Sequence, residues 1–295
     1  MCEEIEKILK NKKDGSKREI MEPDNELKKI QTRIFELLNR IEKPNWLMSG
    51  KRYTSYVDNA RKHQDNSFVT TMDIEKFYDS TQEVQVYNFF KQRLETSIDV
   101  ACIITYLLTF EGKIPTGTSC SQLIAYLAYE EVFQKINSLC EENCLEFTLW
   151  VDDMTISSNG IIDKSVISSI NNILVSRALR IKKSKTIMWS SKRNKTITGV
   201  IVRKDGTLSV PNEKRKPILD LFIKCKNEKE IHPKNLLKLK GMLTSARQIE
   251  SNIFPEVDQY LKSKNEIIKK YNRECNNRTK LSKSKCRKNE LVNLG

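Results

Sequence analysis

The chain has 295 residues, of which 38% are hydrophobic, and its mean hydropathy is −0.54. This size allows one large domain or two to three packed subdomains, and no apolar run approaches the ~20 residues that cross a membrane. The net charge of +14 is uneven, because residues 181–295 hold 29 Lys and Arg against 11 Asp and Glu. A basic second half favours a polyanionic partner such as nucleic acid, although a solvated basic surface has the same pattern.

The cysteines and the N-terminus indicate the compartment. The eight cysteines form no CxxC pair, and His63 and His232 are the only histidines that could join them in a zinc site. We therefore expect free thiols in a reducing cytosol rather than disulfides or structural zinc. The first residues, MCEE, are acidic and unlike a signal peptide. These features predict a cytoplasmic protein that does not bind a membrane.

The first half of the chain predicts helices around one apolar strand. After a charged start with a turn at Asp14-Gly15, Asn25–Ile41 has the spacing of an amphipathic helix. A β-rich run, Phe68–Met72, ends at Asp73. Further helices are predicted over residues 84–94, 98–110 and 119–140, with a loop at 111–117.

The second half predicts a hairpin, further strands and then helices. Leu145–Trp150 and Met154–Ser157 read as strands that are separated by Val151, Asp152 and Asp153. A helix over 165–179 and strands over 186–189 and 196–202 follow, and the chain is helical from Pro211 onward. The last twenty-five residues are rich in Lys, Arg and Asn, which is typical of disordered or RNA-ordered tails. The order predicts an α+β sheet layered with helices, followed by a basic helical subdomain.

Three carboxylates lie at the ends of apolar strands. One acid at such a place usually caps or solubilises, but here Asp73 and the Asp152-Asp153 pair both occur at strand ends. Clustered carboxylates repel one another unless cations join them, and hard oxygen ligands suit Mg²⁺. Two such ions can hold the attacking and leaving oxygens of a phosphoryl transfer. The pattern is therefore consistent with a two-metal site.

Four segments resemble the motifs of reverse transcriptases in order and spacing: FVTTMDIEKFYDS (68–80), IPTGTSCSQ (114–122), LWVDD (149–153) and Lys185-Thr186. They match motifs A, B, C and D, with Trp150 where the family commonly has Tyr. The resemblance implies a right-hand polymerase fold with fingers at 1–66 and part of 81–115, a palm at 67–205, a compact helical thumb at 206–272 and a basic tail at 273–295.

Two short elements are similar to those of retron reverse transcriptases. NARKH (59–63) fits the NAxxH element before motif A, and ITG (197–199) fits the VTG element. From the residues alone they also read as a loop–helix turn and a strand–turn edge. The resemblance implies an enzyme that copies a cognate noncoding RNA into branched single-stranded DNA (msDNA), commonly in anti-phage defence. The implied partners are that RNA, the RNA–DNA hybrid, dNTPs, an effector protein and a host ribonuclease H acting on the product.

The resemblance also implies catalytic roles. Asp73 and Asp152 are expected to bind two Mg²⁺ ions, which Mn²⁺ could replace, and the carbonyl of Ile74 is expected to join them. Asp153 is expected to be a nearby electrostatic partner or outer ligand. Lys185 is expected to neutralise or protonate the leaving pyrophosphate, or else to be one of several phosphate-screening lysines.

Further residues are expected to contact the nucleotide. Tyr78 matches the steric gate against ribose, and its alternative is core packing beside Phe77. Gly117 would let the backbone approach the nucleotide, or be a simple loop glycine. The remaining nucleotide candidates are Lys17 and Arg18 in the fingers, Thr116, where the family often has Gln, and Gln122, which could instead cap its helix or face the template.

RNA contacts are expected from the two retron elements and from the basic thumb. Asn59, His63, Thr198 and Gly199 are candidates by resemblance. The phosphate-binding candidates of the thumb, or else members of one solvated helical face, are Lys234, Lys238, Lys240 and Arg247. Two alternatives remain: a reverse transcriptase of another lineage, and a non-catalytic RNA-binding scaffold.

Overall fold

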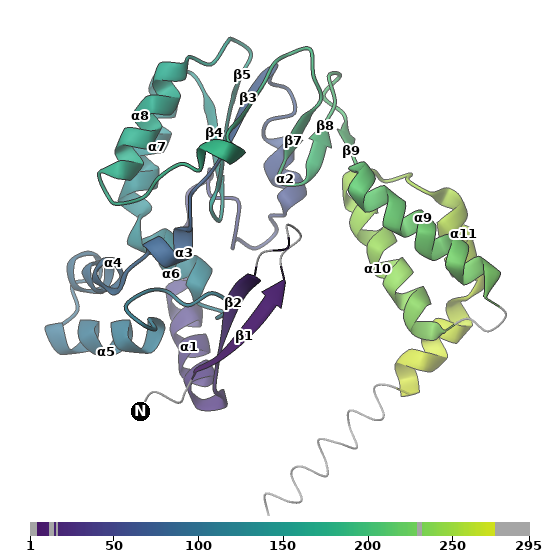
Figure 1. Cartoon of the computed structure of the whole chain (residues 1–295), viewed down its shortest axis with the longest axis horizontal. Helices are drawn as coiled ribbons and strands as arrows, with labels where there is room; N and C mark the ends of the chain where they lie inside the picture. Colours follow the sequence, from purple (N-terminus) through teal and green to yellow (C-terminus); the bar gives the residue numbers. More distant parts are fainter. Residues whose placement is uncertain (1–4, 12–14, 16, 229–231, 275–295) are drawn as a thin grey trace, which may run out of the picture. The chain divides into compact units, whose positions relative to one another are not determined.

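The computed structural model describes residues 5–11, 15, 17–228 and 232–274 (Figure 1). It divides the chain into two compact units, Met1–Thr207 and Leu208–Gly295. Helices and sheets both contribute to the first unit, which confirms the predicted α+β class. In the part of the chain that the structure describes, no helix is both long and apolar enough to cross a membrane.

A four-stranded antiparallel sheet forms the centre of the first unit, in the order β4-β5-β3-β6. Its strands are β3 (Phe68–Asp73), β4 (Glu146–Trp150), β5 (Asp153–Ser158) and β6 (Ile187–Trp189). Consecutive residues of β3, β4 and β5 are buried, so both faces of the sheet are covered, since side chains alternate between the faces of a strand. The register places Asp73 of β3 opposite Asp153 of β5. The predicted strand and hairpin are thereby confirmed.

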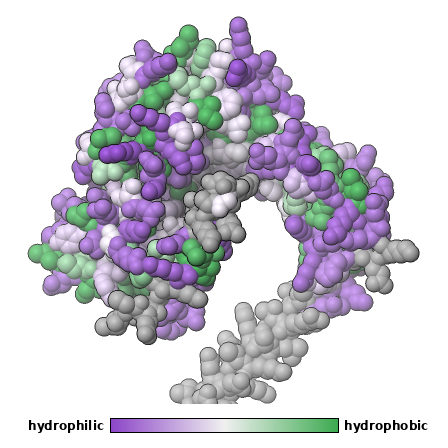
Figure 2. Space-filling view, viewed as in Figure 1, coloured by the Kyte–Doolittle hydropathy of each residue, from purple (hydrophilic) through white to green (hydrophobic). Residues whose placement is uncertain are grey.

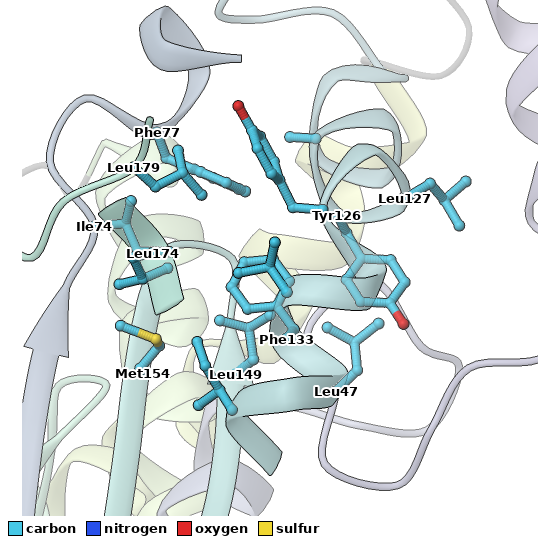
Figure 3. Close-up of a cluster of buried hydrophobic side chains, with 14 of the residues drawn as sticks. Leu47, Ile74, Phe77, Tyr126, Leu127, Phe133, Leu149, Met154, Leu174 and Leu179 are labelled. Atoms are coloured by element: carbon cyan, nitrogen blue, oxygen red, sulfur yellow. The ribbon is translucent and has the colours of Figure 1, made fainter. Parts of the chain in front are cut away.

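Three helices pack against this sheet: α6 (Ser121–Ala128), α7 (Glu130–Glu142) and α8 (Lys164–Val175). Phe133 of α7 and Leu174 of α8 are fully buried, and they lie near Leu149 and Met154 of the hairpin strands (Figure 3). Burial of one such side chain stabilises the fold by about 1.5–3 kcal/mol. This core fixes the hairpin that carries two of the carboxylates.

The predicted helix over 119–140 is interrupted at Tyr129, where the backbone leaves helical geometry (φ −123°, ψ 16°). The ring of Tyr129 is 2% exposed and packs 6.0 Å from that of Phe77, while its hydroxyl donates to the carbonyl of Ser80 (3.1 Å). These tertiary contacts outweigh the local preference for a continuous helix.

The remaining helices of the first unit surround motif-bearing loops. They are α1 (Asn25–Leu38), α2 (Tyr56–Arg61), α3 (Phe77–Ser80), α4 (Glu83–Asn88) and α5 (Ile98–Leu108). α1 begins at the cap Asp24, whose carboxylate accepts from the backbone N–H of Leu27 (2.7 Å). The predicted helix over 84–94 is α4 followed by a π-helical turn, η1 (Phe89–Arg93). A short 3₁₀ turn, η2 (Lys183–Lys185), precedes β6.

Two hairpins depart from the predicted elements. The charged N-terminal segment forms strands β1 (Ile5–Asn11) and β2 (Lys17–Pro23), which pair antiparallel. The predicted strand over 196–202 is in fact the hairpin of β7 (Lys195–Ile197) and β8 (Val200–Val202). Its two-residue turn, Thr198-Gly199, has positive φ at both positions (44° and 76°), as tight hairpin turns require.

The second unit begins with β9 (Leu208–Ser209) and continues with α9 (Asn212–Asn227), α10 (Pro233–Ile249) and α11 (Pro255–Ser263). Pro233 and Pro255 occupy first-turn positions, where proline is well tolerated. Leu236, Leu239 and Val257 form its buried centre, whereas hydrophilic side chains cover most of its visible face (Figure 2). Most of the predicted tail lies outside the described residues.

Candidate active site

The three predicted carboxylates meet at one end of the central sheet. Asp73 ends β3, and Asp152 and Asp153 follow Val151 at the turn between β4 and β5. One side-chain oxygen from each lies within 4.8 Å of the others. The backbone N–H of Ile74 donates to the carbonyl of Asp152 (2.9 Å), which holds the turn against the end of β3. The sequence prediction that two strand ends deliver carboxylates to one place is confirmed.

The carboxylates create a negative site. Burial, and then the charges of Asp152 and Asp73, raises the pKa of Asp153 to about 7. Lys185 Nζ donates to Asp73 Oδ1 (2.8 Å), and this bond raises the pKa of the lysine. One ammonium does not balance three carboxylates. An all-oxygen donor set with surplus negative charge fits Mg²⁺ or Mn²⁺.

The carboxylates open onto a cavity of about 670 Å³. Tyr78 and Phe77 of α3 lie on its wall, and their ring centroids are 5.9 Å apart. Phe77 is 3% exposed, whereas Tyr78 is half-buried and faces the cavity. Thr116, Trp150 and Lys182 line it too. The cavity thus collects residues from motifs A, B, C and D of the sequence.

Gly117 is held close to the β1–β2 hairpin. Its φ is +116°, and a Cβ there would lie 2.5 Å from Cγ2 of Ile20 on β2. The neighbouring Thr116 carbonyl accepts from the N–H of Met21 (2.8 Å). The close approach of β2 therefore requires a glycine at this position for packing alone, in addition to the predicted approach of a nucleotide.

Other nucleotide candidates are placed differently. Gln122 of α6 does not line the carboxylate cavity but a separate one of about 130 Å³ that also borders Val151 and Gly50. Lys17 and Arg18 belong to β2, but their side chains lie outside the described part of the structure.

Sequence reasoning missed Ser49. Its side chain is 3% exposed, and its Oγ accepts from the backbone N–H of Val151 (2.9 Å). Val151 is a β-branched residue at φ 59°, a conformation that costs about 1–3 kcal/mol. Segment 46–49 reaches this turn because Leu47 bridges to Leu149. No local signal marks Ser49, since its partner is 102 residues away.

Ser49→Ala is expected to lower the rate of nucleotide addition by about 10- to 100-fold, because Asp152 follows the freed N–H directly and small misplacements in a site are costly. Ser49→Thr, which keeps the hydroxyl, should retain most activity. Single-turnover extension assays measure both. Ser168→Ala, which removes an exposed hydroxyl on α8, is the matched control. Equal rates for Ser49→Ala and wild type would contradict a role in holding the turn.

The two elements similar to those of retron enzymes meet each other inside the first unit. Asn59 Nδ2 donates to Thr198 Oγ1 (3.4 Å), and that hydroxyl donates to the Tyr56 carbonyl (2.9 Å). The ring nitrogens of His63 lie 2.6 Å from Ser157 Oγ and 2.7 Å from Thr148 Oγ1. The two elements therefore tie α2 to the β7–β8 hairpin and to the central sheet.

This placement corrects one expectation. Asn59 and His63 are both 0% exposed, so neither side chain can contact RNA directly in this structure. Asn59 Nδ2 and both ring nitrogens of His63 have partners within the protein, as buried polar groups generally require. Asn59 Oδ1 is buried and has no hydrogen-bond partner among the described residues. Thr198 and Gly199, at the hairpin turn, are half-buried.

The burial of His63 predicts a pH dependence. Desolvation, and then the charge of Lys62, lowers the pKa of His63 to about 3. The unfolded chain binds the proton more readily, so folding free energy is lost as the pH falls below the ordinary value near 6.5. Between about pH 7 and about pH 5 we expect a loss of about 2 kcal/mol. Denaturant unfolding of wild type and His63→Gln at both pH values measures it, and an equal pH dependence in the two proteins would contradict it.

The basic candidates of the second unit all lie on α10. Lys234, Lys238 and Lys240 are exposed. Arg247 instead pairs with Asp258 (2.9 Å), and its side chain is 30% exposed. The three lysines therefore remain available to phosphates, whereas Arg247 is engaged within its own unit.

Comparisons with known proteins identify the family of this chain. The family model described as reverse transcriptase (RNA-dependent DNA polymerase) matches residues 10–202. Retron Se72 reverse transcriptase of Salmonella heidelberg is 30% identical over 89% of this chain and 75% of that protein. Retron Ec83 reverse transcriptase of Escherichia coli is 24% identical over 85% of each chain.

Solved structures share the fold. Telomerase of Candida albicans with a fragment of telomeric RNA has a TM-score of 0.52 at 12% identity and covers 83% of this chain. Apo telomerase of Candida tropicalis has a TM-score of 0.56 at 10% identity and covers 90%. This chain spans 56% and 58% of those chains, respectively. At such identities the likeness concerns the fold alone.

Proposed function

Because this chain belongs to the reverse transcriptase family, in its retron-type bacterial group, we propose that it copies a cognate noncoding RNA into branched msDNA by two-metal phosphoryl transfer. As a member of the reverse transcriptase family, the chain is an RNA-directed DNA polymerase with the right-hand polymerase fold. The carboxylate cluster of Asp73, Asp152 and Asp153 is the observation that carries the chemical part of the proposal.

The residues of the cavity suit this reaction. Asp73 and Asp152 would hold the metal ions together with the carbonyl of Ile74, and Asp153 would add negative charge beside them. Bound divalent ions would neutralise charge on the triphosphate and hold the attacking and leaving oxygens. Lys185, within 2.8 Å of Asp73, is close enough to place its ammonium beside the leaving pyrophosphate.

The substrate side of the proposal uses three further groups. Tyr78, on the cavity wall, would crowd a ribose 2′-OH and so select dNTPs. Thr116 and Gly117 would lie under the sugar of the incoming nucleotide. The exposed lysines of α10 would bind the phosphates of the RNA–DNA hybrid, which gives affinity without sequence readout.

The biological setting is also a proposal. Retron relatives support a dedicated noncoding RNA as template. We propose that the product serves anti-phage defence with an effector protein, and that a host ribonuclease H trims the RNA. The protein would act in the cytoplasm.

The test is to express the chain with its native flanking locus and to extract nucleic acid. The sample is treated with ribonuclease and with debranching enzyme and resolved on a denaturing gel. A discrete single-stranded DNA that shifts on debranching, and that is absent from Asp152→Asn/Asp153→Asn, supports the proposal. Primer extension by the purified protein without such a DNA would assign it to another reverse transcriptase lineage, and the absence of both would favour a non-catalytic scaffold.

A further inference from the structure

Tyr53 is the most exposed large side chain with apolar character in the described residues, at 99%. A tyrosine ring normally buries most of its area, since it contributes strongly to cores and interfaces. In the described part of the chain, the ring stacks on no other aromatic residue, and its hydroxyl has no hydrogen bond. Its backbone also has φ 62°, which is rare for a bulky residue. Packing within this unit therefore does not explain why a tyrosine occupies position 53.

The loop around Tyr53 is held firmly. Thr54 Oγ1 donates to the carbonyls of Met48 (2.9 Å) and Lys51 (3.0 Å). Lys43 Nζ donates to the carbonyl of Gly50 (2.8 Å). On the other side, Ser55 begins α2 through a reciprocal capping box with Asp58. The ring is thus presented from a loop that is anchored at both ends.

The loop begins beside the catalytic turn. Tyr53 follows Ser49 by four residues, a span of at most about 14 Å. Ser49 Oγ accepts from the N–H of Val151 (2.9 Å), which directly precedes Asp152. Gly50 borders the same small cavity as Gln122 of α6. A strand whose nucleotide is at the catalytic carboxylates can therefore reach Tyr53 with its neighbouring nucleotides.

The charge near Tyr53 fits a nucleic acid. Arg52 is exposed and forms no ion pair within the residues that the structure describes. Between Lys43 and Ser55 the sequence contains Lys51 and Arg52 but no acidic residue. Positive charge beside an exposed aromatic ring is the combination that binds single strands, through phosphate contacts and base stacking.

We propose that Tyr53 is a stacking platform for an unpaired base of the RNA template, with Arg52 on the adjoining phosphate. The inference rests on the proposed function, since it assigns a contact to the template of that reaction. The ring supplies the stacking and the hydroxyl is not needed.

The experiment measures binding of two RNA–DNA duplexes by fluorescence anisotropy: one blunt, and one with a single-stranded RNA template overhang. Tyr53→Ala should weaken binding of the overhang duplex by about 10- to 100-fold, the range of one lost base–aromatic stack. Binding of the blunt duplex should not change. Tyr53→Phe should bind both like wild type. Tyr106→Ala removes another exposed tyrosine, on α5, and is the matched control.

The outcomes separate the two proposals. Equal overhang affinity for Tyr53→Ala and wild type, or an equal loss for Tyr53→Phe and Tyr53→Ala, would overturn the stacking platform while primer extension leaves the polymerase in place. Equal overhang affinity for Tyr53→Ala and wild type would instead point to a protein partner for this ring. A wild-type protein that extends no primer would overturn the proposed function and this inference together.

Discussion

Asp152→Asn/Asp153→Asn is expected to reduce nucleotide addition by at least about a thousandfold, which corresponds to about 4 kcal/mol of transition-state stabilisation. An amide keeps the size of the side chain but loses the charge that attracts divalent ions. Because Asp73, Asp152 and Asp153 share one site within 4.8 Å, two amides leave a single carboxylate there. The rate is measured by single-turnover primer extension on an RNA template with saturating Mg²⁺.

The matched control is Asp163→Asn/Asp205→Asn, which removes two exposed carboxylates. Asp163 caps α8 and Asp205 accepts from Thr207 in a turn, and asparagine replaces aspartate well at such places. This control should retain wild-type activity. Polymerisation by the Asp152/Asp153 variant at a comparable rate would show that these carboxylates do not bind the catalytic ions.

The stability of the same variant shows whether it loses activity through the missing charges or through misfolding. The pKa of Asp153 is raised to about 7, above the ordinary range of aspartate, by burial and then by Asp152 and Asp73. Its contribution to stability is therefore complete below about pH 4 and is lost as the pH rises to about 7. Without divalent ions, wild type should therefore lose stability over this range relative to the variant, because the opposite effect of His63 is the same in both proteins. Thermal unfolding of both proteins in the presence of a chelator, from about pH 4 to about pH 7, measures this difference, and a cooperative transition of the variant would show that it is folded.

The clustered carboxylates of the candidate site were predictable because local sequence signals place them at strand ends. An apolar run that ends in Asp73, and two strands separated by a short turn with Asp152 and Asp153, place charges at strand ends before any tertiary contact is known. The antiparallel pairing of β3 with β5 then puts Asp73 opposite Asp153. Strand period and turn length suffice for this part of the site.

Ser49 and the break at Tyr129 were not predictable in this way. Ser49 acts on a turn 102 residues away, and Tyr129 interrupts a helix because its ring packs on Phe77. The N-terminal strands were missed because a charged segment has little apolar alternation to indicate them. For Ser49 and Tyr129 the deciding contact joins residues that are distant in the sequence, so a local sequence pattern cannot predict it.

The resemblance to retron enzymes predicted that residues of these two elements contact RNA, but the structure buries Asn59 and His63 inside the protein. Asn59 and His63 are distinctive in the sequence, and the expectation was that they contact RNA. The structure uses them to join α2 to Thr198 and to the hydroxyls of Thr148 and Ser157. A motif identifies residues that belong together, whereas burial decides whether they can reach a partner.

Tyr78→Ala is expected to raise the use of rNTPs relative to dNTPs by about 100-fold, because the clash that rejects a 2′-OH is removed. Tyr78 is half-buried on the wall of the carboxylate cavity, five residues after Asp73. Its neighbour Phe77 is 3% exposed and belongs to the hydrophobic core, whereas Tyr78 packs against that core and also lines the cavity. The ratio of kcat/KM for a dNTP and the matching rNTP measures the effect.

Two controls distinguish a gate from a packing residue. Tyr78→Phe keeps the ring and should keep the selectivity of wild type. Phe77→Leu disturbs the core beside it and should lower stability and both kcat/KM values without changing their ratio. If Tyr78→Ala lowered activity equally with both nucleotides, its ring would serve packing alone. A rise in rNTP use that is specific to Tyr78→Ala would instead mean that the sugar of the incoming nucleotide lies against this ring.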